Sequence, residues 1–298
     1  MAFHVKRTLP GSASYALVSD AASADTAIVY VHGFLGDAGT TWEYLPYYVD
    51  RFSDEPLRDA DLYFFDYAAE NQSVQASVLA LRIFLDQVFP TPPPELLRAT
   101  LREIDWHLAD DPDTVLLRQS RPYSRLILVG HSLGAVVVRR LVADEAVRHQ
   151  GAARRNADVT LAPLLNAEVV LMAPAHLGFQ LAGANALLKV LPFSLWGFRL
   201  AAVFRAFSDL QPGCHTLAQL QRETEKMAGV FPSAIALRPR ALWGDREDVV
   251  LVGRFDSDPP PDGRSSAPGK DHVTVCKVTR DYRLPVDYMV RPKVAAGG

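Results

Sequence analysis

The pentapeptide G-H-S-L-G at residues 130–134 constrains the fold more than any other feature of the sequence. An apolar, β-branched run at 126–129 leads into it, and a helix-compatible run at 135–147 follows it. In this strand–turn–helix context, G-x-S-x-G predicts a sharp turn that presents the serine at the carboxyl end of a sheet. Glycines flank the serine because side chains at those positions would clash in so tight a turn. We therefore interpret Ser132 as a candidate nucleophile, against the simpler reading of an ordinary glycine turn.

Short apolar runs alternate with helix-compatible stretches along the chain. Continuous apolar runs bounded by turn residues are typical of parallel strands, because helices cover both faces of such a sheet. The alternation predicts an α/β fold in three layers, with a mostly parallel central sheet flanked by helices. Strands are expected at 27–31, 62–65, 126–129, 169–172 and 241–243, and helices at 42–52, 74–88, 135–147 and 216–227.

We expect residues 1–298 to form one domain, a length that can bury a large core. Three segments depart from the alternation. Residues 90–125 open with P-T-P-P-P and read as a surface insertion, with a helix expected at 95–108. Residues 179–207 are unusually apolar but contain Pro192 and Gly197, which favours a helical cap or a buried core segment over a spanning helix. Residues 256–270 are rich in Pro, Gly, Ser and Asp and predict a loop.

Composition excludes several classes of function. The net charge is −3, with acidic and basic residues interspersed, so no electrostatic footprint for nucleic acid is expected. Cys214 and Cys276 form no metal or disulfide pattern and fit a reducing compartment. The N-terminus lacks the apolar core of a signal peptide, and no apolar run is long enough to span a membrane. These features favour a cytoplasmic protein.

A serine nucleophile needs a base, an acid that orients the base, and donors for the oxyanion. A G-x-S-x-G turn of this type is followed in the chain by the acid and then by the histidine. His272 is the candidate base, because it lies in a late loop at 269–273 that can reach back over Ser132. The run at 273–278 is expected to begin the final helix or strand. His176 follows the strand at 169–172 and is expected to shape the substrate pocket, whereas His215 is expected to be structural.

The acid should follow the strand at 241–243, where the chain reads G-D-R-E-D-V-V at 244–250. Three carboxylates compete at this point. We prefer Asp248, because it directly precedes an apolar pair, with Asp245 as the second choice and Glu247 as the third. The acid would fix the tautomer of His272 and stabilise its protonated form.

The oxyanion hole needs two backbone N–H groups. One comes from the residue after the nucleophile, Leu133, and the other from the loop after an early strand. The sequence H-G-F-L-G-D at 32–37 follows the strand at 27–31, which makes Phe34 the second candidate donor. Gly33, His131 and His176 are the residues that we expect beside the substrate.

Four segments together resemble the lipase-like serine α/β-hydrolases, nearest to the serine-active-site-containing and GPI-inositol-deacylase-like groups. These are V-Y-V-H-G-F-L-G-D, L-V-G-H-S-L-G, M-A-P-A-H-L-G and K-D-H-V-T-V-C-K, in that order along the chain. The resemblance extends from about residue 27 to residue 277, and S-D-L-Q-P-G at 208–213 resembles a further short motif of the family. It implies the α/β-hydrolase fold, no cofactor and no metal, with Ser132 as nucleophile and His272 as base.

We therefore expect a serine esterase or lipase that acts on a small-molecule or lipid ester. The apolar segment 179–207 is compatible with an acyl-chain pocket, with peripheral membrane contact or with a buried core. An acyltransferase or thioesterase would use the same catalytic groups, so these activities stay open. A non-catalytic α/β-hydrolase-fold protein used for binding or signalling is the alternative of a different class.

Overall fold

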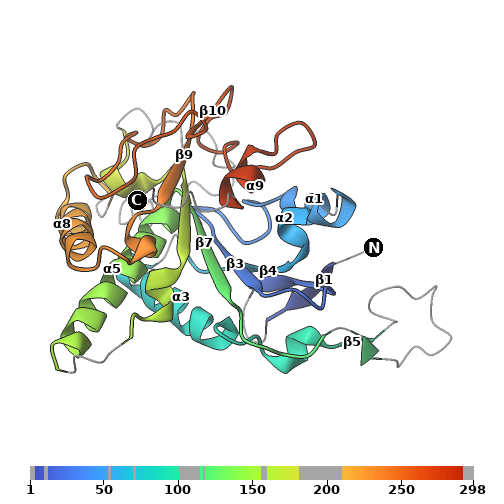
Figure 1. Cartoon of the computed structure of the whole chain (residues 1–298). Coiled ribbons are helices and arrows are strands. Elements are labelled where there is room, and N and C mark those ends of the chain that lie inside the picture. The colour runs from blue at the N-terminus through green and yellow to red at the C-terminus, as the bar shows by residue number, and fades with distance from the viewer. Residues whose placement is uncertain are drawn as a thin grey trace.

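The computed structural model describes residues 4–9, 13–52, 55–69, 72–100, 115–116, 118–155, 160–180 and 210–290. At its centre is an eight-stranded sheet of order β1-β2-β4-β3-β7-β8-β9-β10 (Figure 1). The pairs β1–β2 and β2–β4 are antiparallel and all other neighbours are parallel, which confirms the predicted mostly parallel sheet. The strands are β1 (His4–Thr8), β2 (Tyr15–Ser19), β3 (Thr26–Val31), β4 (Ala60–Phe65), β7 (Arg125–His131), β8 (Glu168–Met172), β9 (Arg240–Gly244) and β10 (Ser266–Ala267).

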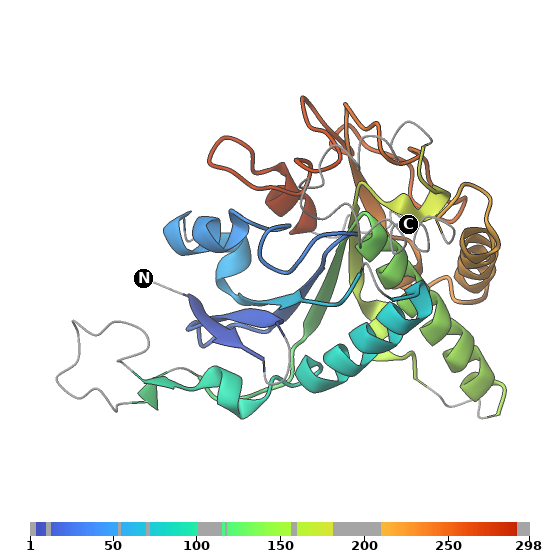
Figure 2. The same ribbon diagram turned by 180° about the vertical axis from the view of Figure 1, so that it is seen from behind.

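Helices cover both faces of this sheet (Figures 1 and 2). Successive side chains of a strand point to opposite faces, and the two buried clusters of the core follow this alternation. Val29 and Leu128 pack with one set of helices, whereas Ile28 and Ile127 pack with the other set. The first set is α3 (Val74–Val88), α5 (Leu133–Ala153) and α8 (His215–Val230), and the second is α1 (Leu45–Phe52), α2 (Glu55–Arg58) and α9 (Leu284–Met289).

The local sequence explains where α3 begins. Ser73 has an extended backbone, and its hydroxyl oxygen accepts a hydrogen bond from the Ala76 N–H, which satisfies one of the free donors at the start of the helix. Leu81 is then fully buried against the sheet, while Leu79 on the opposite side of the helix is 60% exposed. The helix therefore contributes one apolar face to the core, as its spacing of apolar residues predicts.

The structure differs from the expected secondary structure in three places. The helix expected at 95–108 is wrong in its described part, where a single 3-10 turn, η1 (Pro94–Leu97), is followed by β5 (Ala99–Thr100). β5 pairs with β6 (Val115–Leu116) in a small sheet apart from the central one, so strand pairing outweighs local helix propensity there. β10 lies inside the segment expected to be loop, and the stretch 273–278 forms turns rather than a helix or strand.

Two predictions on organisation remain untested hypotheses: the single domain over 1–298 and the surface insertion at 90–125. The apolar cap or core segment expected at 179–207 lies outside the described residues, except for Phe179 and Gln180. None of the helices in the described ranges is both long enough and apolar enough to cross a membrane.

Truncation of two leucines on α3 tests this orientation of the helix. We expect Leu81→Ala to lower the free energy of unfolding by about 2–5 kcal/mol, because it leaves a cavity in the core. The matched exposed variant, Leu79→Ala, should change it by less than about 0.5 kcal/mol. Chemical denaturation measures both values, and equal effects of the two variants would contradict the placement of α3.

Candidate active site

Ser132 lies in a strained turn between β7 and α5. Its φ angle is 53°, in the left-handed region that non-glycine residues rarely adopt. Three backbone hydrogen bonds hold this conformation. The Ser132 N–H donates to the carbonyl oxygen of Met172 (3.0 Å), and the Ser132 carbonyl accepts from Ala135 (3.1 Å) and Ala175 (3.2 Å). The end of β8 and the first turn of α5 therefore fix the backbone that carries the hydroxyl.

Two glycines allow the chain to approach Ser132 closely. A Cβ atom added to Gly134 would lie 2.2 Å from the carbonyl oxygen of Val31, so only glycine lets α5 start directly beside the end of β3. A Cβ atom added to Gly33 would lie 2.8 Å from the Cβ atom of Ser132. The loop after β3 thus passes against the serine, at the place where the sequence predicts the oxyanion loop.

His272 and Glu247 complete a continuous hydrogen-bonded group with Ser132. His272 Nε2 is 2.9 Å from Ser132 Oγ, and His272 Nδ1 is 3.0 and 3.1 Å from the two carboxylate oxygens of Glu247. Because a carboxylate only accepts, we assign the proton to Nδ1, which leaves Nε2 free to accept from the serine hydroxyl. His272 lies in the loop after β10 and Glu247 in the turn after β9, so both come from the same end of the sheet as Ser132.

The structure corrects the order of preference among the three carboxylates. Glu247, the third choice, contacts His272 with a side chain that is only 1% exposed, whereas Asp248 and Asp245 are exposed. The reason is the path of the turn. The Val249 and Val250 N–H groups donate to Glu247 Oε1 (3.0 and 3.1 Å), which turns this longer side chain inward. Asp248 therefore does not orient the histidine.

The turn that carries Glu247 and the loop that carries His272 are also hydrogen-bonded to each other. The Arg246 N–H donates to the Lys270 carbonyl (3.0 Å) and the Asp245 N–H donates to the Ala267 carbonyl (3.1 Å). Within the histidine loop, Asp271 accepts hydrogen bonds from the backbone of residues 273 and 274. Burial alone would raise the pKa of Asp271, but hydrogen bonds from Thr274 outweigh it and hold the pKa below its usual value. This charged carboxylate stabilises the turn around His272.

His32 holds the loop that carries Gly33 and Phe34 in place, a role that sequence reasoning missed. Its Nδ1–H donates to the Gly33 carbonyl (2.9 Å), and its Nε2 accepts from the Tyr67 N–H (3.3 Å). The Tyr67 ring stacks on the imidazole, and the Tyr67 hydroxyl donates to the His32 carbonyl (2.9 Å). The only signal in the sequence was the histidine before Gly33, because Tyr67 follows a different strand.

The two predicted oxyanion donors both belong to segments next to Ser132. Leu133 is the first residue of α5, and Phe34 directly follows Gly33 in the loop against the serine. Within the described part of the chain, no hydrogen bond uses the N–H of either residue. Both groups are thus available to an acceptor at the site, as an oxyanion hole requires.

His131 and His176 are buried, and each ring is hydrogen-bonded to a backbone carbonyl. His131 Nε2–H donates to the His272 carbonyl (2.8 Å), and His176 Nε2–H donates to the Gly253 carbonyl (3.1 Å). Burial lowers the pKa of His131 to about 3 and the pKa of His176 well below its usual value, so both rings are neutral. We predicted that these two rings contact substrate. Their placement favours a structural role instead, because the N–H of each ring already donates to a backbone carbonyl.

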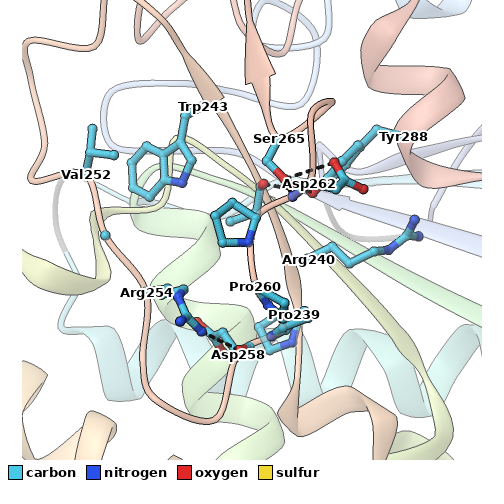
Figure 3. Close-up of a pocket in the computed structure, with 14 residues that line it drawn as sticks. Pro239, Arg240, Trp243, Val252, Arg254, Asp258, Pro260, Asp262, Ser265 and Tyr288 are labelled. Atoms are coloured by element: carbon cyan, nitrogen blue, oxygen red, sulfur yellow. Dashed lines mark hydrogen bonds between the residues drawn. The ribbon is translucent and has the colours of Figure 1, made fainter. Parts of the chain in front are cut away.

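A pocket of about 370 Å³ lies beside β9, where Figure 3 shows Trp243, Arg254 and Pro260 around it. None of the residues that line it is Ser132, His272 or Glu247. The Trp243 ring meets the edge of His176, with 6.2 Å between centroids. The pocket is thus separate from the three hydrogen-bonded residues.

Among the described residues, no group of three or more His, Cys, Asp or Glu side chains could hold a metal ion.

The match to a family model agrees with the fold. The model of the alpha/beta hydrolase family matches residues 28–288. Similar solved structures include the mature lipase BlEst2 of Bacillus licheniformis, at 15% identity over 97% of this chain and 96% of that chain, with a TM-score of 0.47. Est1E from Butyrivibrio proteoclasticus shows 11% identity over 95% and 93% of the two chains, with a TM-score of 0.44. A search of curated proteins gives no match.

The buried, neutral His131 predicts a pH dependence of stability. Between about pH 6.5 and pH 3 the unfolded chain binds a proton at this ring that the folded chain does not, so acid lowers the free energy of unfolding. After burial, electrostatic interactions with the neighbouring groups His272, His32 and Lys277 also lower the pKa of His131.

We expect His131→Gln to reduce the acid-side slope of the unfolding free energy by up to about 1.4 kcal/mol per pH unit. Denaturation curves at intervals from pH 4 to pH 8 measure this slope. The range above about pH 7, where the ring is neutral in both states, is the internal control. An unchanged slope below pH 6 would show that His131 is not buried as described.

Proposed function

The chain belongs to the alpha/beta hydrolase family, and from this premise we propose that it is a serine hydrolase that cleaves carboxylic esters through an acyl-enzyme on Ser132. The observation that carries the proposal is the continuous hydrogen-bonded group of Ser132, His272 and Glu247. This arrangement of nucleophile, base and orienting acid is recognised by geometry, whatever fold it occurs on.

In the first half of the reaction, Ser132 Oγ attacks the carbonyl carbon of the ester while its proton passes to His272 Nε2. Glu247 accepts the hydrogen bond from Nδ1–H and stabilises the positive charge that the ring acquires. The carbonyl oxygen becomes an oxyanion, for which the N–H groups of Phe34 and Leu133 are the proposed donors. The tetrahedral intermediate then collapses, its bond to the alcohol breaks, and His272 returns the proton to the leaving alcohol oxygen.

In the second half, a water molecule replaces the alcohol. His272 Nε2 takes a proton from the water as its oxygen attacks the acyl carbon, and a second tetrahedral intermediate forms. Its collapse breaks the bond to Ser132 Oγ, which receives the proton from His272, and a carboxylic acid leaves. An acyltransferase would use another acceptor in place of water, and a thioesterase would release a thiol, so product analysis distinguishes these alternatives.

The finer features of the substrate are hypotheses. A lipid ester would need an apolar acyl-chain site, for which the sequence offers the segment 179–207. A cytoplasmic location and peripheral contact with a membrane are likewise hypotheses that come from the sequence. The competing non-catalytic reading predicts that the site, although complete, modifies no ester.

Replacement of the nucleophile tests the mechanism. We expect the wild-type protein to hydrolyse p-nitrophenyl esters, and Ser132→Ala to lower kcat by about 10³–10⁶-fold without a change in the unfolding midpoint. A series of acyl chains from acetate to palmitate then distinguishes an esterase from a lipase. Wild-type rates in Ser132→Ala would rule out Ser132 as the nucleophile, and no cleavage by any form would favour the non-catalytic alternative.

Two neighbouring carboxylates provide a matched test of the acid. We expect Glu247→Gln to lower kcat by about 10³–10⁴-fold, because the amide no longer fixes the His272 tautomer or balances its charge. The exposed Asp248→Asn should stay within about twofold of the wild type, as surface changes usually do. The reverse pattern, measured with the same esters, would restore Asp248 as the acid.

A further inference from the structure

The residue before the nucleophile contacts the residue that serves as its base. His131 ends β7, and its Nε2–H donates to the backbone carbonyl of His272 over 2.8 Å, across 141 residues of sequence. The two rings lie 5.1 Å apart between centroids and are tilted by 46°. Two adjacent residues therefore contact His272: the Ser132 hydroxyl bonds to its ring, and the His131 ring bonds to its backbone carbonyl.

The tautomer of His131 follows from its partner. A carbonyl oxygen can only accept, so the proton must be on Nε2. Burial and the nearby His272 keep the ring neutral at ordinary pH, as its pKa of about 3 indicates. Neutrality matters here because a charged ring at this distance would oppose the positive charge that His272 acquires during the reaction. The residue thus donates without adding a charge to the site.

The packing leaves little freedom to this ring. A Cβ atom added to Gly33 would lie 3.1 Å from His131 Nδ1, and the edge of the ring meets Trp42 with 6.4 Å between centroids. The register of β7 with β8 pairs His131 with Met172, whose carbonyl also accepts from the Ser132 N–H. Both the ring and the backbone of His131 are therefore closely surrounded by neighbours.

The acyl-enzyme shows why a second hold on His272 is needed. Once Ser132 Oγ is esterified it has no proton, so it can no longer donate to His272 Nε2. The described contacts that remain for the His272 side chain and its carbonyl are those with Glu247 and His131. Glu247 can fix the ring, but it contacts only the side chain. We propose that His131 is a positioning residue that holds the backbone of His272 in place, above all while the acyl-enzyme waits for water.

This proposal rests on the proposed function, and it makes a specific kinetic claim. Loss of the donor should slow deacylation more than acylation, because during acylation the Ser132 hydroxyl still anchors the base. We expect a loss of the order of 10–10²-fold in deacylation, the size that small misplacement of a catalytic group costs. A direct contact between His131 and substrate would instead change kcat/KM, with an effect that depends on the acyl chain.

The test compares one variant that loses the donor with one that keeps a donor. His131→Leu keeps the apolar bulk and loses the donor, whereas His131→Gln can still donate from its side-chain amide. Each protein is mixed with saturating p-nitrophenyl acetate and quenched in acid, and intact-mass spectrometry measures the fraction that carries an acetyl group. This fraction equals the acylation rate constant divided by the sum of the acylation and deacylation rate constants, so it needs no visible burst.

The deacylation rate constant equals kcat divided by the acylated fraction, and kcat/KM reports acylation alone. We expect the deacylation rate constant to fall about 10–10²-fold in His131→Leu and to return toward the wild-type value in His131→Gln, with kcat/KM within about twofold throughout. An unchanged deacylation rate constant, an equal defect in both variants, or a loss confined to kcat/KM would overturn the positioning role. If His131→Leu does not fold, histidine ¹⁵N spectra of the wild type decide, because a His131 ring that titrates near pH 6 or carries its proton on Nδ1 also overturns it. A wild type that neither turns over nor becomes acylated would instead refute the proposed function.

Discussion

The left-handed backbone of Ser132 is the constraint on which the site depends. A non-glycine residue in this region costs about 1–3 kcal/mol, so it persists only where the surroundings enforce it. Here hydrogen bonds with Met172, Ala135 and Ala175 enforce it, and Gly134 lets the helix begin directly against β3. The strained turn places the Ser132 hydroxyl beyond the end of β7, within hydrogen-bond distance of His272 in the loop that follows β10.

The parallel sheet brings those loops together. β3, β7 and β9 run in the same direction, so the loops that carry Phe34, Ser132 and Glu247 leave the sheet at the same end of its strands. His272 arrives from the segment after β10, which is bound to the turn that carries Glu247 by backbone hydrogen bonds. Two buried imidazoles also hold these loops. The His32 ring hydrogen bonds to the Gly33 carbonyl in the loop that carries Phe34, and the neutral His131 ring donates to the carbonyl of His272.

The sequence predicted the parts of the molecule whose signals are local. Continuous apolar runs located the parallel strands, and the family match over residues 28–288 confirms the α/β-hydrolase fold. Motif and chain order pointed to Ser132 and His272 as single residues, and the structure places their side chains within hydrogen-bond distance. The carboxylate beside His272 was not the preferred one, because three carboxylates within 245–248 give the same local signal and only the fold of the turn directs Glu247 inward. The bond from His131 to a carbonyl 141 residues away has no local signal at all.

The central claim is that His272 activates Ser132, and covalent labelling by a fluorophosphonate measures this activation without any assumption about the substrate. The probe reacts with an activated serine, and peptide mass spectrometry identifies the residue that carries it. The account predicts labelling at Ser132 in the wild type and a labelling rate that falls by at least about 10³-fold in His272→Ala, since the hydroxyl then has no base. Equal labelling rates in the two proteins, or a label on another residue, would contradict the account.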